Sequence, residues 1–534
     1  MDLKVVAKDK YLIAAIMLTL ASVAYWSAFA VNAYSTYHEY TDLGQFAYDM
    51  YYHIHYLSAE HGLQFIVFAN HITPDLILLL PIFAVAQSAL TLLIAQAIIL
   101  SLTGMVLFLV ARDILKSDKI AIVLAFAFLA NPGMHGMLVF DFHVESLIPI
   151  FLLLTFYFAV KNRKLLFAGS LLLLLGAMDA APVAAGALAV GMGVYALMRE
   201  SGEQRRRWLG YAGVILISSF IVYGLYGFTV KTLISQYQAG DYPTLPTFNM
   251  VINTVGSQAS QLGSAGLTGL GSSYAGFGIY LIFAIAIIFL GFGVSMVFDI
   301  IPAIILVSPW LVEALIIKNT GFVFIWNQYF GFALGGMAVA AILGLKTLHE
   351  RKGYIAKHII RDHHTRHAYI IGSIAVCSIV LLLFSPYFTL SKNVNNLQQD
   401  FLFNVNATVK PQVAALTSIV KIVPQNASLM APFFTMPHLF KRQYFEQIPP
   451  TAGDITPINI TSKNATIYGM YFYPDYIVAD FNPYISLNAF YGSQFQNFMN
   501  ITGGKVVNNT LVFNGIYKIY AYNGTAILLK RINV

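Results

Sequence analysis

The chain has 534 residues, of which 58% are hydrophobic and only 10% are charged, and its formal net charge is +7. Soluble domains carry about 25% charged residues, so this composition is typical of a protein that lies largely in lipid. The basic residues do not cluster with aromatic residues, which argues against nucleic-acid binding. The single cysteine, Cys377, excludes an intrachain disulfide or a thiolate metal site. We therefore expect the lipid bilayer to be the main partner.

Apolar runs recur along the chain at lengths that suit membrane helices, since a helix crosses about 30 Å of hydrocarbon in about 20 residues. Eleven spans are predicted, near residues 11–31, 89–111, 119–139, 146–160, 165–178, 180–198, 208–230, 277–298, 300–317, 328–345 and 368–390. Residues 165–198 also fit one bent hairpin. The run 74–87 is too short to span and is predicted to lie on the membrane surface. The fold class is thus an all-α polytopic membrane protein.

The distribution of Lys and Arg predicts the orientation. With the N-terminus in the cytoplasm, the inner segments before residue 390 hold nineteen basic residues and the outer loops hold two, Lys231 and Lys318. Such an excess marks the cytoplasmic side. The start of the chain also fits a signal peptide, but its apolar run is longer than usual, which favours a retained first helix. We expect a multi-pass plasma-membrane protein with its C-terminus outside.

The tail, residues 391–534, supports this orientation. Seven N-x-S/T sequons start there and none occurs before residue 400; they begin at Asn406, Asn426, Asn459, Asn464, Asn500, Asn508 and Asn523. Glycosylation at such sites requires an extracytoplasmic face, although a segment rich in Asn and Thr also produces sequons by chance. An amphipathic helix near 408–422, short β-rich runs and Asn-Gly turns predict a small α/β domain. It follows a transmembrane domain over 1–390.

Two outer loops of the transmembrane domain are long. Loop 32–73 holds acids, histidines and many tyrosines but no Lys or Arg, which predicts short helices at the interface. Loop 231–276 is rich in Gly, Ser, Thr and Gln. It fits either a flap that gates substrate or a plain connection.

Three groups of acidic residues reach the predicted outer side and can converge on one cavity. Asp42 lies in the first outer loop, Asp141 lies between the third and fourth spans, and Asp179 lies between two apolar runs. Ionisable groups at membrane depth are costly and are usually paired or functional. For Asp49 and Glu60 we prefer plain solvation at the interface. Asp42 and Asp141 are the candidate catalytic acids.

Two histidines accompany these acids. His71 precedes Thr73-Pro74, and His143 lies two residues after Asp141. Together with Glu145, the pair Asp141 and His143 provides the oxygen and nitrogen ligands of a divalent metal such as Mg or Mn. A polar anchor at the interface is the alternative. No phosphate loop, nucleophile elbow or Cys/His metal spacing occurs, so neither ATP-driven transport nor serine hydrolysis is supported.

These motifs resemble those of a family of archaeal and bacterial membrane proteins of unknown function. The segment 42–46 (DLGQF) resembles the family motif F-D-L-G-x-F, 71–74 (HITP) resembles H-F-S-P, and 140–145 (FDFHVE) matches F-D-F-H-x-E fully. In the tail, 423–428, 437–439 and 475–480 are also similar to the family. The chain departs from the pattern at Thr41, and around Asp179 it lacks the usual Lys and Glu.

The layout of this family is similar to that of GT-C membrane glycosyltransferases, in which an essential acid lies in a long first outer loop. The resemblance implies inverting sugar transfer from a polyprenyl-phosphate-linked donor at the outer leaflet. Asp42 would act as the general base. His71, Asp179 and Lys318 would bind the substrate, and the leaving phosphate needs a cation from histidine, lysine or the metal.

Two alternatives from other functional classes stay open. A transporter or flippase for a lipid-linked or small polar substrate would use the intramembrane acids as proton or ion sites. A non-catalytic surface or assembly protein would bind partners through the tail.

Overall fold

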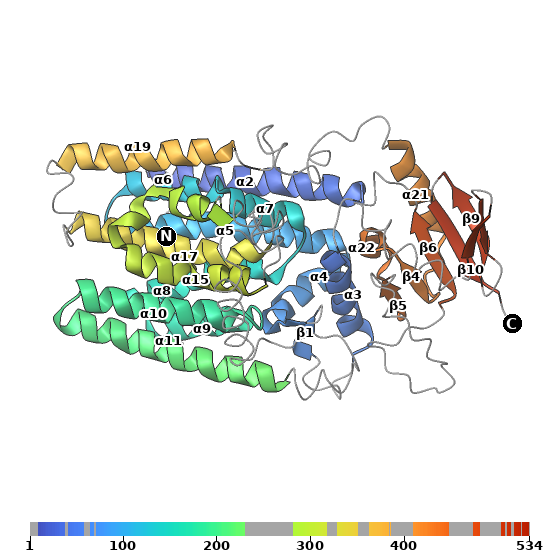
Figure 1. Cartoon of the computed structure of the whole chain (residues 1–534), viewed down its shortest axis with the longest axis horizontal. Helices are drawn as coiled ribbons and strands as arrows, with labels where there is room; N and C mark the ends of the chain where they lie inside the picture. The colour runs from blue at the N-terminus through green and yellow to red at the C-terminus, as the bar shows by residue number, and fades with distance from the viewer. Residues whose placement is uncertain are drawn as a thin grey trace, which may run out of the picture.

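The computed structural model describes residues 9–37, 41–57, 65–68, 71–229, 281–282, 284–317, 328–350, 363–383, 385, 410–447, 474–480, 504–507, 510–513, 517–524 and 526–532. These residues form a bundle of helices that carries the α/β elements of the tail at one end (Figure 1).

Seven helices of the described chain are long and apolar enough to cross a membrane. They are α2 (Lys10–Ser35), α5 (Ala89–Leu115), α6 with α7 (Asp118–Leu129 and Pro132–Phe140), α10 (Ala181–Arg199), α11 (Gly202–Thr229), η5 with α15 (Ser295–Asp299 and Ile300–Ile317) and α17 (Gly331–His349). The apolar window of α17 is 94% buried, whereas that of α11 is 22% buried. The centre of the bundle is therefore α17, whereas α11, whose first turns are charged and whose remaining turns are apolar, lies at the periphery of the bundle.

The described chain also has five shorter apolar helical stretches, among them η3 with α8 (Val144–Leu147 and Ile148–Val160), α9 (Lys164–Gly176) and the part Ala368–Leu382 of α19 (His363–Leu382). At a rise of 1.5 Å per residue, α9 is about 20 Å long, against about 30 Å of hydrocarbon. A helix of this length that starts at one boundary of the hydrocarbon ends about 10 Å inside the other boundary. Irregular backbone at such depth is tolerated where it is buried in protein.

The predicted helix over 277–298 is wrong in its second half. Residues 284–290 are helical, but β3 (Gly291–Val294) is extended and η5 follows it. Gly293 has a φ of +63°, and a Cβ there would lie 2.9 Å from the backbone of Ile374 on α19. The close approach of β3 to α19 therefore requires glycine. The predicted total of eleven spans is not confirmed.

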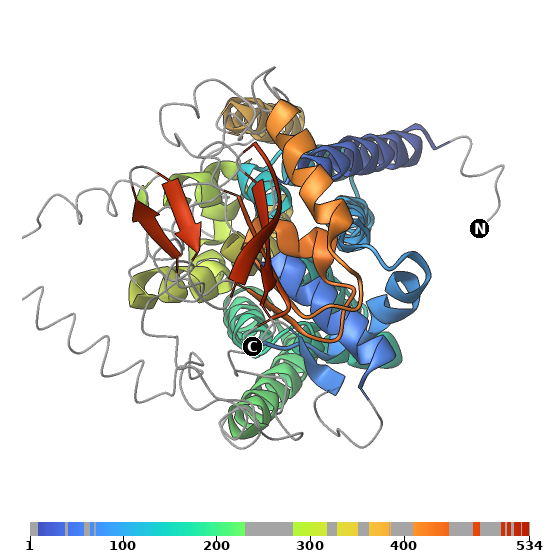
Figure 2. The same cartoon turned by 90° about the vertical axis from the view of Figure 1, so that its right-hand side faces the viewer.

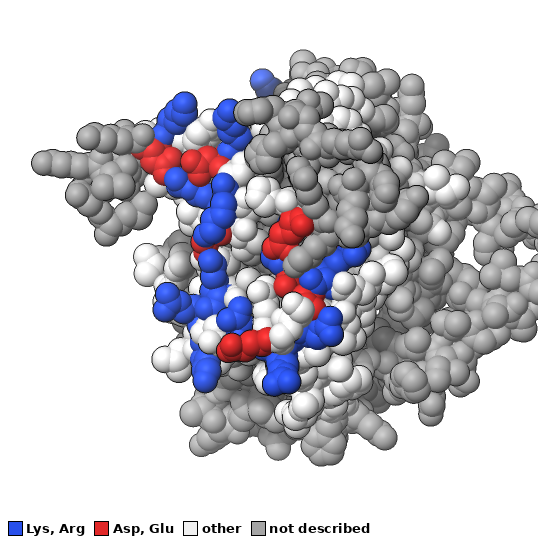
Figure 3. All heavy atoms as spheres, turned by 90° about the vertical axis from the view of Figure 1, so that its left-hand side faces the viewer, with Lys and Arg blue, Asp and Glu red and all other residues white. Residues whose placement is uncertain are grey.

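Basic loop residues gather at the end of the bundle opposite the tail (Figure 3). Ion pairs hold these loops together: Lys161 lies 2.6 Å from Asp113, and Arg112 lies 2.5 Å from Asp9. Arg199 makes a bidentate contact with buried Asp299. The basic end and the tail thus lie on opposite sides of the helical bundle, which is the arrangement that the charge count predicts. Which side faces the cytoplasm stays a prediction.

The segment between α2 and α5 forms a layer at the tail end of the bundle. It contains α3 (Thr41–His55), the antiparallel pair β1 (Val67–Phe68) and β2 (His71–Ile72), and then η2 (Pro74–Leu79) and α4 (Leu80–Ala86). The helix expected in loop 32–73 is α3, while loop 231–276 lies outside the described residues.

The tail contains a five-stranded mixed sheet in the order β5-β4-β6-β10-β9, viewed in front of the bundle in Figure 2. β4 pairs in parallel with β5 and β6, while β10 pairs antiparallel with β6 and β9. The elements are α21 (Lys410–Ile422), β4 (Leu429–Ala431), η7 (Phe433–Thr435), α22 (Met436–Leu439), β5 (Phe445–Gln447), β6 (Tyr476–Asp480), β9 (Tyr517–Asn523) and β10 (Ala526–Arg531), with a separate hairpin of β7 (Gly504–Val507) and β8 (Thr510–Phe513). The expected amphipathic helix is α21, and the expected turn at 523–524 joins β9 to β10. The domain boundary predicted at 390 lies outside the described residues.

Helix α22 of the tail packs directly on α3. A Cβ on Gly44 would overlap the Cβ of Met436 and would lie 3.2 Å from Pro437, so glycine permits this contact. The ring of His438 lies 4.2 Å from the rings of both Tyr34 and Tyr37. The tail is thereby fixed against the end of α2 and against α3, whose first turn carries Asp42.

Candidate functional site

Asp42 and His143 form a short, charge-assisted pair. Asp42 lies in the first turn of α3, and His143 follows α7; His143 Nε2 lies 2.5 Å from Asp42 Oδ2. The His143 side chain is 6% exposed, whereas that of Asp42 is 38% exposed. The carboxylate therefore faces an opening, and the histidine supports it from the buried side.

Hydrogen bonds to α5 and α3 hold the backbone of residues 140–145 in place. Gln96 of α5 donates to the carbonyl oxygens of Met137 (2.8 Å) and Asp141 (2.6 Å) and accepts from the backbone N–H of His143 (2.6 Å). The Asp141 carboxylate accepts the backbone N–H of Leu43 at 3.0 Å. Asp141 thus holds the first turn of α3, which carries Asp42, and this contact supports a positioning role.

His71 and Asp179 form a second pair. His71 Nδ1 lies 3.3 Å from both carboxylate oxygens of Asp179. His71 belongs to β2, and its side chain is 42% exposed; Asp179 lies in the turn between α9 and α10 and is buried. Because α9 is short, this turn reaches the pair from within the bundle.

The two pairs act on each other electrostatically. Burial lowers the pKa of His71, but the hydrogen bond and charge of Asp179 raise it to about 9, and the carboxylates of Glu145 and Asp42 add to the rise. Burial raises the pKa of Asp42, but the hydrogen bond and charge of His143 bring it below the usual value. At neutral pH an ionised carboxylate therefore lies near a cationic imidazole.

His143 has an unused polar atom. Burial lowers its pKa, while the hydrogen bond and charge of Asp42 raise it to about 8. Its Nδ1 is buried and makes no hydrogen bond within the described part of the chain. A buried polar atom without a partner is unusual in a folded protein and marks a place where a water molecule or a ligand atom binds.

Of the remaining predicted site residues, the structure describes Glu145 but not Lys318. Glu145 is buried beside His143 and His71 and contributes to their electrostatics. Within the described ranges, no group of three or more His, Cys, Asp or Glu side chains is arranged to hold a metal ion. The metal role of Asp141, His143 and Glu145 therefore stays a prediction. Lys318 lies outside the described residues.

Two of the seven sequon asparagines are described, Asn426 and Asn523, and both are exposed on the tail. The Asn523 amide donates to Ser418 at 2.9 Å. The other five lie outside the described residues.

Sequence reasoning missed the role of Gln96. The sequence does contain an indication: Gln96 places an amide side chain within the 27-residue apolar helix α5, where an amide without hydrogen bonds would destabilise the protein.

The comparison with known families agrees with the motifs. A family model described as "Predicted membrane protein (DUF2079)" matches residues 24–487, which include Asp42, His71, the 140–145 segment and Asp179. No curated protein matches the chain. The resemblance drawn from the sequence motifs is thereby confirmed.

Proposed function

We propose that this chain, which belongs to the DUF2079 family of predicted membrane proteins, is a glycosyltransferase that uses a polyprenyl-phosphate-linked sugar at the outer leaflet. One arrangement carries the proposal: the partly exposed carboxylate of Asp42 pairs with His143, and His71, which Asp179 holds, interacts with Asp42 electrostatically at the tail end of the bundle. Sugar transfer from a lipid phosphate needs both a base and a positive charge.

The proposed reaction is a single displacement. Asp42 accepts the proton of the acceptor hydroxyl as the acceptor oxygen forms a bond to the anomeric carbon of the sugar. The bond from that carbon to the phosphate oxygen breaks, and its electron pair leaves on the polyprenyl phosphate. The configuration at the anomeric carbon inverts.

The supporting residues have separate tasks. His143 donates to Asp42 and keeps it ionised and oriented. His71, held by Asp179, stabilises the negative charge that develops on the leaving phosphate. Asp141 positions α3 through the N–H of Leu43. A divalent metal on Asp141, His143 and Glu145 is the other predicted source of positive charge, and loss of activity on chelation would identify it.

The test is sugar transfer by the purified full-length protein, supplied with a panel of polyprenyl-phosphate sugars and membrane-extract acceptors. Asp42→Asn removes the base, so transfer should fall by about 10²- to 10⁴-fold. Glu203→Gln is the matched control, since Glu203 is exposed at the start of α11 and distant from the site. Undiminished transfer by Asp42→Asn would refute the base assignment.

A transporter is the second candidate, and the depth of the buried Asp179 favours it, since acids at membrane depth often bind protons or ions. Proteoliposome flux with no covalent change in the substrate would support it and would exclude the transferase.

A further inference from the structure

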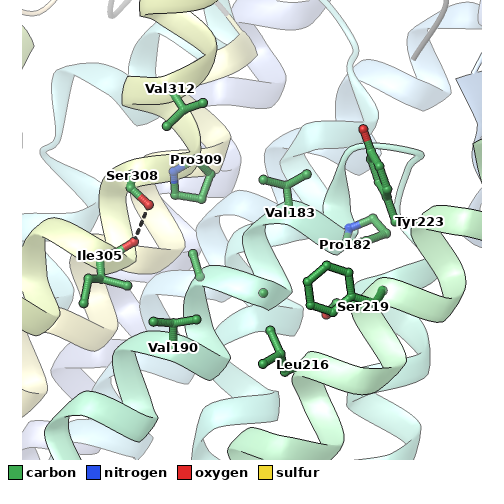
Figure 4. A pocket seen from close by; sticks show the side chains of 13 residues that line it. Pro182, Val183, Val190, Leu216, Ser219, Tyr223, Ile305, Ser308, Pro309 and Val312 are labelled. Carbon is green, nitrogen blue, oxygen red and sulfur yellow. Dashed lines mark hydrogen bonds between the residues drawn. The ribbon is translucent and has the colours of Figure 1, made fainter. Parts of the chain in front are cut away.

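An apolar groove opens on the lipid-facing side of α10, α11 and α15 (Figure 4). It has a volume of about 410 Å³ and is lined by residues that include Val183, Val190, Phe220 and Pro309. Phe220 is 71% exposed, so the groove is open to the surroundings of the bundle. Its volume lies in the range of ligand sites.

The sequence produces this groove through small side chains and a proline. Gly186 has no neighbouring heavy atom within 4 Å of the position of a Cβ, so α10 leaves space there. Pro309 lies inside α15. Ser308 satisfies its own hydroxyl by donating to the Ile305 carbonyl at 2.8 Å, as the dashed line in Figure 4 indicates. Ser219 likewise donates to the Ile215 carbonyl at 2.8 Å, so apart from Tyr223 the lining is apolar and suits a hydrocarbon chain.

The groove lies in the half of the bundle near the candidate site. Its α10 residues run from Pro182 to Val190, at the end of the helix that follows Asp179 and away from basic Arg199. Tyr223 lines the groove on α11 and interacts electrostatically with Asp179. Pro182 follows Asp179 by three residues, so the groove begins next to the turn that carries Asp179.

We propose that this groove binds the first part of the polyprenyl chain of the lipid-linked substrate, with its phosphate at His71. This inference rests on the proposed function and adds the position of the lipid. A phosphate at His71 would place the start of the attached chain near the turn of Asp179, next to Pro182, where the groove begins. Because the groove and the surrounding lipid are both apolar, the groove supplies orientation more than affinity.

The test uses a polyprenyl phosphate with a photoactivatable diazirine near its phosphate end, added to the full-length protein in nanodiscs. Labelled peptides identified by mass spectrometry should fall within 182–190 and 216–223. Gly186→Phe fills the groove and should lower labelling about tenfold, whereas Gly372→Phe on α19, also with open space at the Cβ, should leave it unchanged. If Gly186→Phe does not fold, Val183→Trp at the exposed part of the lining replaces it.

The outcomes separate this inference from the transferase proposal. Unlabelled polyprenyl phosphate should compete, and phosphatidylglycerol at the same concentration should not; equal competition would overturn the inference. Sugar transfer by the wild type with labelling away from α10 and α11 would refute the groove alone. Labelling in the groove with no transfer to any acceptor would refute the transferase and leave the groove standing as a site for lipid phosphate.

Discussion

Replacement of Gly44 by alanine should separate the tail from α3. The new Cβ would overlap the Cβ of Met436 and lie 3.2 Å from Pro437 Cδ and 3.3 Å from the Met436 backbone. Neither backbone can yield like a flexible side-chain end, so α3 or α22 must shift. Overpacking of this kind costs about 1–3 kcal/mol, which raises the undocked fraction by about 5- to 150-fold.

Limited proteolysis measures that fraction. Arg442 is buried, and the carbonyl of the next residue, Gln443, accepts the hydroxyl of Tyr48 on α3 at 2.8 Å, so trypsin reaches this bond only when the tail separates from α3. Cleavage after Arg442 should therefore accelerate in Gly44→Ala. Sugar transfer should also fall, because Asp42 lies two residues before the strained contact at position 44. Gly169→Ala on α9 is the control, since its Cβ meets nothing within 4 Å. Unchanged cleavage and transfer in Gly44→Ala would refute the packing argument.

Three further predictions concern the site and the tail. Sugar transfer should be high between the lowered pKa of Asp42 and about pH 9. The rate should fall at low pH because Asp42 gains a proton, and above pH 9 because His71 loses its proton. A pH–rate profile that stays flat through pH 9 would contradict the role of His71. Gln96→Leu leaves buried backbone groups of residues 137–143 without hydrogen bonds, and each such group lowers the stability by about 1–3 kcal/mol. Both the Tm and the rate of sugar transfer should fall. An unchanged Tm would contradict the positioning role of Gln96. If the host glycosylates its envelope proteins, Asn426→Gln and Asn523→Gln should each remove one glycan mass from the intact protein, and an unglycosylated wild-type tail in that host would contradict an outward-facing tail.

The apolar periodicity of the chain predicted most of the helices but could not detect where they break. The run 119–139 divides at Asn131-Pro132, where Asn131 Oδ1 accepts the N–H of Gly133 and caps α7. The run 277–298 breaks at Gly291, where close packing determines the backbone. The first break depends on a local side-chain cap, and the second depends on packing against α19. Neither contact changes the hydropathy of the sequence.

For the site, sequence motifs predicted the participants but not their pairing. Asp42, His71, His143 and Asp179 were expected to approach one another, because ionisable groups at the membrane boundary are rarely left unpaired. That Asp42 pairs with His143 while Asp141 holds a backbone N–H depends on the path of residues 140–145 past Gln96. Such a path is set by tertiary packing and has no local signature.

The most direct test of the account is the titration of His71 by NMR in nanodiscs, with isotope-labelled histidine and His71→Gln for assignment. The account predicts a pKa of about 9, a large fall in Asp179→Asn and a smaller fall in Asp42→Asn. A wild-type value at or below 6.5, or one that Asp42→Asn does not change, would mean that the two carboxylate–histidine pairs do not form one site.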